Sequence, residues 1–191
     1  QAVPAEAPVT LLPLTGPAAA RRAEFSGLAW YGDWLILLPQ YPERFSAQVQ
    51  GADGALFALE KRDLLAALDA DAASPLAPRP IPIQWDDLPR KVRGFEGFEA
   101  LAFQGATVYL SIEASPGGGM KGYLVRGEIA PDLSVLRVDS ATLTEIPLPV
   151  DVPNKSIEAL LSVPQGVMAF YEVNGAAVNP APAAWLFSPE M

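Results

Sequence analysis

One pattern of fifteen residues occurs three times in the sequence, and this repeat restricts the fold more than any other feature. The copies are Ser26–Gln40, Glu99–Glu113 and Glu158–Glu172. Each copy has a turn-prone centre flanked by apolar, β-branched and aromatic residues, and the centres are Gly32-Asp33-Trp34, Gly105-Ala106-Thr107 and Pro164-Gln165-Gly166. Such a segment is typical of a β-hairpin. The repeat therefore predicts a stack of similar β-sheets.

The segments that follow each hairpin predict further strands. In the first unit these are a strand at Ala55–Leu59, a short helix with Asp63 as N-cap, and a strand at Ile81–Trp85. The second unit has candidate strands at Tyr123–Ile129 and Leu143–Leu148, and the third has one at Ala184–Phe187. We expect a single domain over residues 1–191, with units at about 25–90, 95–150 and 155–191.

Four antiparallel strands per unit, joined by long variable loops, predict an all-β fold of the β-propeller type. Propellers have about four to eight blades, so three four-stranded blade units cannot close a ring. We therefore expect a partial ring or half of a six-blade assembly, completed by a second copy in a homodimer or by a missing remainder of the propeller. The alternative is a β-sandwich, which also has short strands separated by Pro and Gly.

Composition excludes several classes of function. The chain has 50% hydrophobic residues and a net charge of −9, which indicates a globular protein that does not bind nucleic acid. It has no cysteine and no histidine, which removes thiolate chemistry, imidazole metal ligands and Ser-His or Cys-His nucleophiles. No apolar run approaches the roughly 18–20 residues of a membrane span. The start, Gln1–Pro8, predicts a periplasmic or secreted protein whose signal has been removed.

The ends of the hairpins suggest a cation site. Folding each hairpin about its centre places Glu99 opposite Glu113 and Glu158 opposite Glu172. Like charges in directly opposite positions are destabilising. A Ca²⁺ ion takes six to eight oxygen ligands and would turn this repulsion into coordination, with Glu96 as a further ligand. Innermost blade strands line the central channel, so both pairs could meet near one axis.

Two other interpretations of the same residues stay open. The register could differ by one residue, or the glutamates could be solvated hairpin ends. Alternatively, two carboxyl groups about 5–5.5 Å apart could act as nucleophile and acid/base of a retaining glycosidase. Trp30, Phe103 and Tyr109 could then stack on a sugar, but their positions on alternating strands favour a core between blades.

The hairpins also resemble a known family. Phe25-Ser-Gly-Leu-Ala-Trp, Phe95-Glu-Gly-Phe-Glu-Ala-Leu-Ala and Asn154-Lys-Ser-Ile-Glu-Ala-Leu-Leu are similar to hairpins of the phytase-like, or esterase-like, β-propellers and the related SdiA-regulated family. The chain departs from that pattern at Ala100 and Ala159, where the family has glycine, and at Ser26 and Gln40, where the other copies have glutamate. The resemblance implies a propeller with an acidic, calcium-binding channel. The phosphate-binding motifs of true alkaline phytases are not seen in the sequence.

These observations predict an exported protein that binds a divalent cation, calcium, in an acidic channel and has a ligand- or protein-binding role. The expected ligands are Glu96, Glu99, Glu113, Glu158 and Glu172. The second hypothesis is a metal-dependent phosphoester hydrolase, in which Lys91, Arg93, Lys121 or Lys155 contacts the phosphate. Glycoside hydrolysis is third. The sequence identifies no catalytic residue and no organic cofactor.

Overall fold

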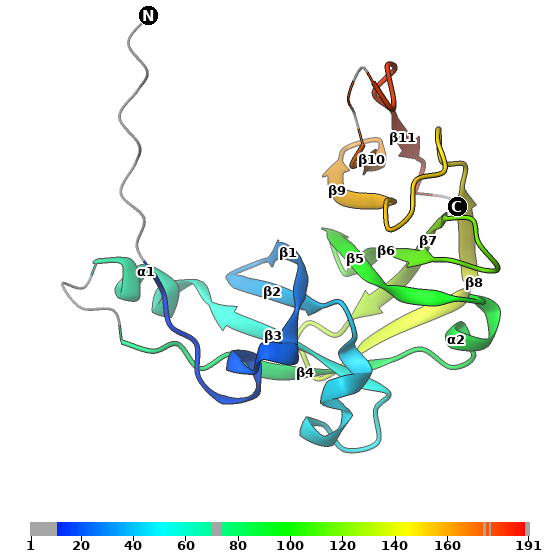
Figure 1. Cartoon of the computed structure of the whole chain (residues 1–191). Coiled ribbons are helices and arrows are strands. Elements are labelled where there is room, and N and C mark those ends of the chain that lie inside the picture. The colour runs from blue at the N-terminus through cyan, green and yellow to red at the C-terminus, as the bar shows by residue number, and fades with distance from the viewer. Residues whose placement is uncertain (1–10, 70–73, 174, 176, 190–191) are drawn as a thin grey trace, which may run out of the picture.

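The computed structural model describes residues 11–69, 74–173, 175 and 177–189, and the chain is all-β in these parts (Figure 1). The segment Gln1–Pro8, from which an exported location was predicted, lies outside the described residues. No helix in the described parts has the length and apolar character needed to cross a membrane.

The strands follow the predicted order. The first unit contains β1 (Phe25–Tyr31), β2 (Trp34–Pro39), β3 (Gly54–Glu60) and β4 (Arg79–Gln84). The second contains β5 (Phe95–Gln104), β6 (Thr107–Ala114), β7 (Lys121–Ile129) and β8 (Leu136–Ile146). The third contains β9 (Ile157–Val163), β10 (Gly166–Tyr171) and β11 (Ala184–Phe187). The three predicted hairpins are therefore β1–β2, β5–β6 and β9–β10.

The helices of the described residues are short and all precede β5. They are α1 (Lys61–Asp69), α2 (Leu88–Lys91) and the 3₁₀ helices η1 (Gly16–Ala19), η2 (Arg21–Ala23) and η3 (Pro42–Gln48). Helix α1 follows β3 directly, so Asp63 lies in its first turn and is not the predicted N-cap. Strand β8 begins at Leu136, seven residues before the predicted Leu143.

The sheets differ from the expected three separate blades. Strands β1–β8 form one sheet in the order β1-β2-β3-β4-β8-β7-β6-β5, and β9–β11 form a second sheet of three. All neighbours are antiparallel except β4 and β8, which pair in parallel at Ile83–Leu136 and Gln84–Arg137. This short ladder joins the first two units. The edge strands β1 and β5 contact each other, so the sheet is nearly closed, like a barrel.

The buried apolar residues form three clusters, two of which lie between units. The largest fills the space between the first two units and includes Ile36, Leu56, Leu110 and Val125. A second lies between the outer face of the first unit and η1–η3 and α1. The third joins Tyr109 and Leu124 of the second unit to the three-stranded sheet. Because β5 contacts both β1 and β9, the first strands of the three units are neighbours in sequence order (Figure 1).

Candidate functional site

The first residue of each repeat copy lies at a β-bulge. Ser26, Glu99 and Glu158 each have no directly opposite partner, because the strand pairing shifts by one residue at these positions. Glu113 therefore faces Gly97 and not Glu99, and the expected register of opposite glutamates is wrong. A bulge inserts one extra residue into a strand and re-aims its side chain. The same irregularity in all three units makes it part of the repeat.

The glutamates nevertheless gather, and we call Glu99, Glu113, Glu158 and Glu172 the glutamate cluster. They come from β5, the end of β6, β9 and the residue after β10. Glu99 is 5% exposed and Glu113 is 2% exposed, whereas Glu158 is exposed and Glu172 is half-buried. Carboxylates are rarely buried without a partner. The contacts between β1, β5 and β9 bring these residues together.

The first unit supplies Gln40 at the position that Glu113 and Glu172 occupy in the other two. Its side-chain amide donates hydrogen bonds to Oε1 of Glu99 at 3.0 Å and to the carbonyl oxygen of Glu96 at 3.3 Å. The backbone carbonyl oxygen of Gln40 accepts a hydrogen bond from the backbone N–H of Phe98 at 2.9 Å. Ser26 at the bulge donates its hydroxyl to the Phe98 carbonyl at 2.6 Å. The first two units are thus joined by polar contacts beside the cluster.

The third unit contributes the only cation that the described residues place beside the cluster. Lys155 Nζ lies 3.0 Å from Oε2 of Glu172. The backbone N–H of Glu172 donates to the carbonyl of Ser156 at 3.2 Å, and Ser111 Oγ donates to the carbonyl of Ile157 at 3.0 Å. One ammonium therefore accompanies four carboxyl groups.

Three buried oxygen atoms at this place have no hydrogen-bond partner among the described residues. They are Oε1 of Glu113, Oε1 of Glu172 and Oγ of Ser156, whose side chain is fully buried. A buried polar atom without a partner costs about 1–3 kcal/mol. Such atoms are rare in folded proteins, and an ion that binds there is one explanation.

Burial and the neighbouring carboxylates raise the pKa values of Glu99, Glu113 and Glu158. Burial, and then the charges of Glu158, Glu113 and Glu172, raise the pKa of Glu99 to about 8, although the Gln40 hydrogen bond opposes the shift. Burial, followed by Glu158, Glu96 and Glu172, raises the pKa of Glu113 to about 7. Glu158 is exposed as a residue, but partial desolvation of its carboxyl group, followed by the charge of Glu172, raises its pKa. Strongly raised carboxyl pKa values are typical of functional sites.

The arrangement is not a ready-made coordination shell. Within the described residues, no group of three or more acidic side chains is placed so that it could hold a metal ion. Glu96 acts on the cluster through its charge and its backbone carbonyl, which accepts the Gln40 hydrogen bond. The structure thus brings the five expected residues into one region without coordinating geometry.

Other residues singled out in the sequence lie elsewhere. Lys91 contacts Ser140 and Asp87, and Lys121 forms an ion pair with Glu145 at 2.7 Å. Tyr109 is buried, as predicted, and Phe103 packs against Tyr31 with ring centroids 5.2 Å apart. Trp30 is 48% exposed, so its predicted place in the core is wrong. Its neighbours Ala29 and Tyr31 pack against the core shared with the second unit, so Trp30 lies on the opposite side of β1.

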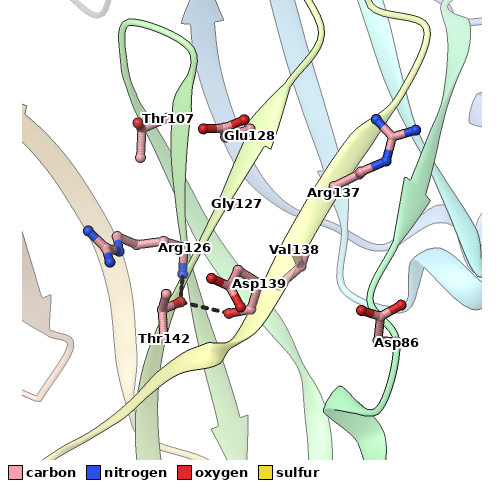
Figure 2. A pocket seen from close by; sticks show the side chains of 9 residues that line it. All are labelled: Asp86, Thr107, Arg126, Gly127, Glu128, Arg137, Val138, Asp139 and Thr142. Carbon is pink, nitrogen blue, oxygen red and sulfur yellow. Dashed lines mark hydrogen bonds between the residues drawn. The ribbon is translucent and has the colours of Figure 1, made fainter.

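A cavity that shares no residue with the glutamate cluster lies over β7 and β8, and Figure 2 shows the residues that line it. It has a volume of about 500 Å³ and carries both signs of charge on its rim. Arg126 and Arg137 point away on opposite sides of it, and Asp139 lies between them (Figure 2). Thr142 Oγ1 accepts the Arg126 backbone N–H at 2.8 Å and donates to the Asp139 carbonyl. Because its charged groups do not converge, this cavity is a weaker candidate for a ligand site.

The sequence analysis did not predict that Gln40 would bind Glu99 or that the Ser156 hydroxyl would be buried without a partner. The repeat itself contained the signal for Gln40, which aligns with Glu113 and Glu172. Ser156 had no such signal, because its burial depends on the packing of the third unit against the second.

No protein-family model, curated protein or solved structure matches the chain.

Proposed function

We propose that the glutamate cluster binds a divalent cation, and that calcium is its natural ion. The observation that carries this proposal is the carboxyl group of Glu113. It is 2% exposed, and its Oε1 has no hydrogen-bond partner among the described residues. The unpartnered hydroxyl of Ser156 and Oε1 of Glu172 add two more oxygen donors of the kind that a hard cation takes.

The donor set favours calcium over other metals. The available groups are carboxylate, hydroxyl and backbone carbonyl oxygens, and the chain has no histidine or cysteine to attract zinc or copper. Calcium accepts six to eight oxygens in variable geometry, whereas magnesium demands a near-ideal octahedron. A cluster without fixed coordinating geometry suits the more tolerant ion.

Binding requires the glutamates to converge. Each glutamate has three side-chain torsions, and Glu158 is exposed, so it can turn inward without unpacking the core. Burial and then the mutual repulsion of the carboxylates raise the pKa values of Glu99, Glu113 and Glu158, and the cation would replace that repulsion. Lys155 is the group that must move or share Glu172 with the ion.

We also infer that the three units are blade-type repeats arranged around the cluster, as in a segment of a propeller. The equivalent bulges at Ser26, Glu99 and Glu158 support this arrangement, as do the contacts of β5 with both β1 and β9. In this arrangement the cation would hold the inner strands of the second and third units together. Its role is then structural or ligand-positioning.

Hydrolysis of phosphoesters receives less support. Such a site needs basic groups that hold the phosphate beside the metal. Lys91 and Lys121 pair with other acidic residues away from the cluster, and Lys155 is paired with Glu172. We therefore prefer a binding protein to an enzyme.

Isothermal titration calorimetry with calcium tests the proposal. We expect saturable binding by the unmodified chain at about pH 8, and its loss in Glu113→Gln, which keeps the shape of the side chain. Glu128→Gln is the matched control, because Glu128 is an exposed strand glutamate outside the cluster. Equal calcium binding by both variants, or none by the unmodified chain, would refute the site.

A further inference from the structure

The three-stranded sheet carries an apolar face that nothing in the described structure covers. Its residues form two rows across the sheet in register: Leu161, Met168 and Leu186 in one, and Ala159, Phe170 and Ala184 in the other. Leu161 is 51% exposed and Leu186 is 57% exposed. We call these six residues the C-terminal face. Contiguous exposed apolar residues mark interaction surfaces.

The repeat identifies the residues of the first two units that are equivalent to the C-terminal face, and their packing is known. Subtracting the offset of 59 residues between the copies places Leu161 at Ala102 and Met168 at Tyr109. Both equivalents are buried against the third unit. Subtracting a further 73 residues gives Ala29 and Ile36, which pack against the second unit. In both cases this side of a unit is the one that packs on the next unit.

The opposite side of each unit packs on the unit before it. In the second unit this side includes Leu101 and Phe103, which belong to or pack against the core shared with the first unit. Their equivalents in the first unit are Leu28 and Trp30 of β1, which are 63% and 48% exposed. The rest of this side is covered by η1–η3 and α1. We call Leu28 and Trp30 the β1 strip.

We propose that the C-terminal face of one copy docks on the β1 strip of a second copy. The two surfaces are the unused halves of an interface that the chain already builds twice, between the first and second units and between the second and third. Complementary halves on one molecule produce head-to-tail association. When two copies each use both halves, the result is a closed dimer of six units. The proposal does not depend on the cation.

A second copy fits the C-terminal face because the repeat gives this chain a surface of the matching kind. Within the chain, the surface that packs on the preceding unit carries a row of large apolar side chains on one strand, such as Leu101 and Phe103 of β5. This chain offers such a row at Leu28 and Trp30, and the row points away from its own core. An unrelated partner would have no reason to match both surfaces.

Analytical ultracentrifugation of the full chain with a chelator present tests the proposal. We expect a dimer that dissociates to monomer in Leu161→Asp and equally in Leu28→Asp, because each variant removes one half of the interface. Both side chains are more than half exposed, so neither change alters the core. Leu68→Asp on α1 is the control, since Leu68 is 49% exposed and lies outside both surfaces, and it should remain dimeric.

Mixing the variants tests the head-to-tail geometry. An equimolar mixture of Leu161→Asp and Leu28→Asp retains one intact interface, between the C-terminal face of one and the β1 strip of the other. We therefore expect the mixture to form a heterodimer that neither variant forms alone. A monomeric unmodified chain at every attainable concentration overturns the proposal. So does a dimer that only Leu161→Asp disrupts, because that result would mean that two C-terminal faces pack on each other.

Discussion

The side-chain amide of Gln40 in the first unit donates a hydrogen bond to Oε1 of Glu99 in the second unit at 3.0 Å. The contact connects residues 59 positions apart in the sequence and reaches a carboxyl group that is 5% exposed. An amide donates a hydrogen bond to Glu99, whereas a carboxylate at the same place would repel it. The one copy of the repeat that ends in glutamine thus stabilises the cluster formed by the other two.

This contact predicts the effect of replacing Gln40 by the glutamate that the other two copies have at this position. Gln40→Glu removes a donor and adds a fourth carboxylate around Glu99, beside Glu113, Glu158 and Glu172. We expect the free energy of unfolding to fall by about 1–3 kcal/mol in urea titrations near pH 8 without divalent cations. Gln48→Glu, at an exposed position of η3, makes the same chemical change and should have little effect. Equal losses in the two variants would show that Glu99 does not depend on Gln40.

The raised pKa values predict an unusual dependence of stability on pH. The pKa values of Glu99 and Glu113 rise from 4.5 to about 8 and about 7 on folding, so the folded state holds protons that the unfolded state has released. Their contribution to stability is full below about pH 4.5 and is lost as the pH rises through 7 and 8. We expect the melting temperature without cations to fall steadily from about pH 5 to pH 8.

Because the chain has no histidine, no imidazole titrates between pH 5 and pH 8 and contributes to this change in melting temperature. In Glu99→Gln/Glu113→Gln the two titrating groups are gone, and the melting temperature should change much less over this interval. A melting temperature that rises with pH in the unmodified chain would mean that the cluster is charged in the folded state.

The close approach of the first two units predicts a packing effect. A Cβ atom on Gly27 would lie 2.8 Å from Cδ2 of Leu101 and 3.2 Å from Cα of Ala100. Gly27→Val should therefore push β1 away from β5 and cost about 1–3 kcal/mol of stability, as overpacking does. Ala141→Val adds bulk at an exposed position of β8 and serves as the control in the same denaturant titration. If both variants unfold alike, β1 is not held tightly against β5.

The three hairpins could be predicted from the sequence, because hairpins depend on turn residues and alternating apolar positions. Gly32, Gly105 and Gly166, each part of a predicted turn centre, all adopt positive φ angles. The bulges at Ser26, Glu99 and Glu158 were not predicted, since one extra residue in a strand leaves no compositional mark. Near the turn Gln104 pairs with Thr107, one residue away from the expected register, and the bulge at Glu99 adds a second residue. Glu113 therefore faces Gly97, although the cluster itself formed.

Long-range pairing was the other feature that the sequence could not supply. The parallel contact of Ile83 with Leu136 joins strands 53 residues apart, and it turns two expected blades into one nearly closed sheet. Trp30 was predicted to be buried because aromatic strand residues usually are. Whether such a side chain is covered depends on which unit lies beside it, and β1 has none on that side. The same reasoning explains the exposed Leu161.

The melting temperature of the unmodified chain at about pH 8, with calcium and then with a chelator, tests the cation site most directly. If the cluster binds calcium, stability should increase as RT ln(1 + [L]/Kd), or about 2.7 kcal/mol at a hundredfold excess over Kd. Glu99→Gln/Glu113→Gln should lose this response yet be at least as stable as the unmodified chain without calcium, because the repulsion is removed. An unmodified chain whose melting temperature is the same in calcium and in chelator would contradict the account.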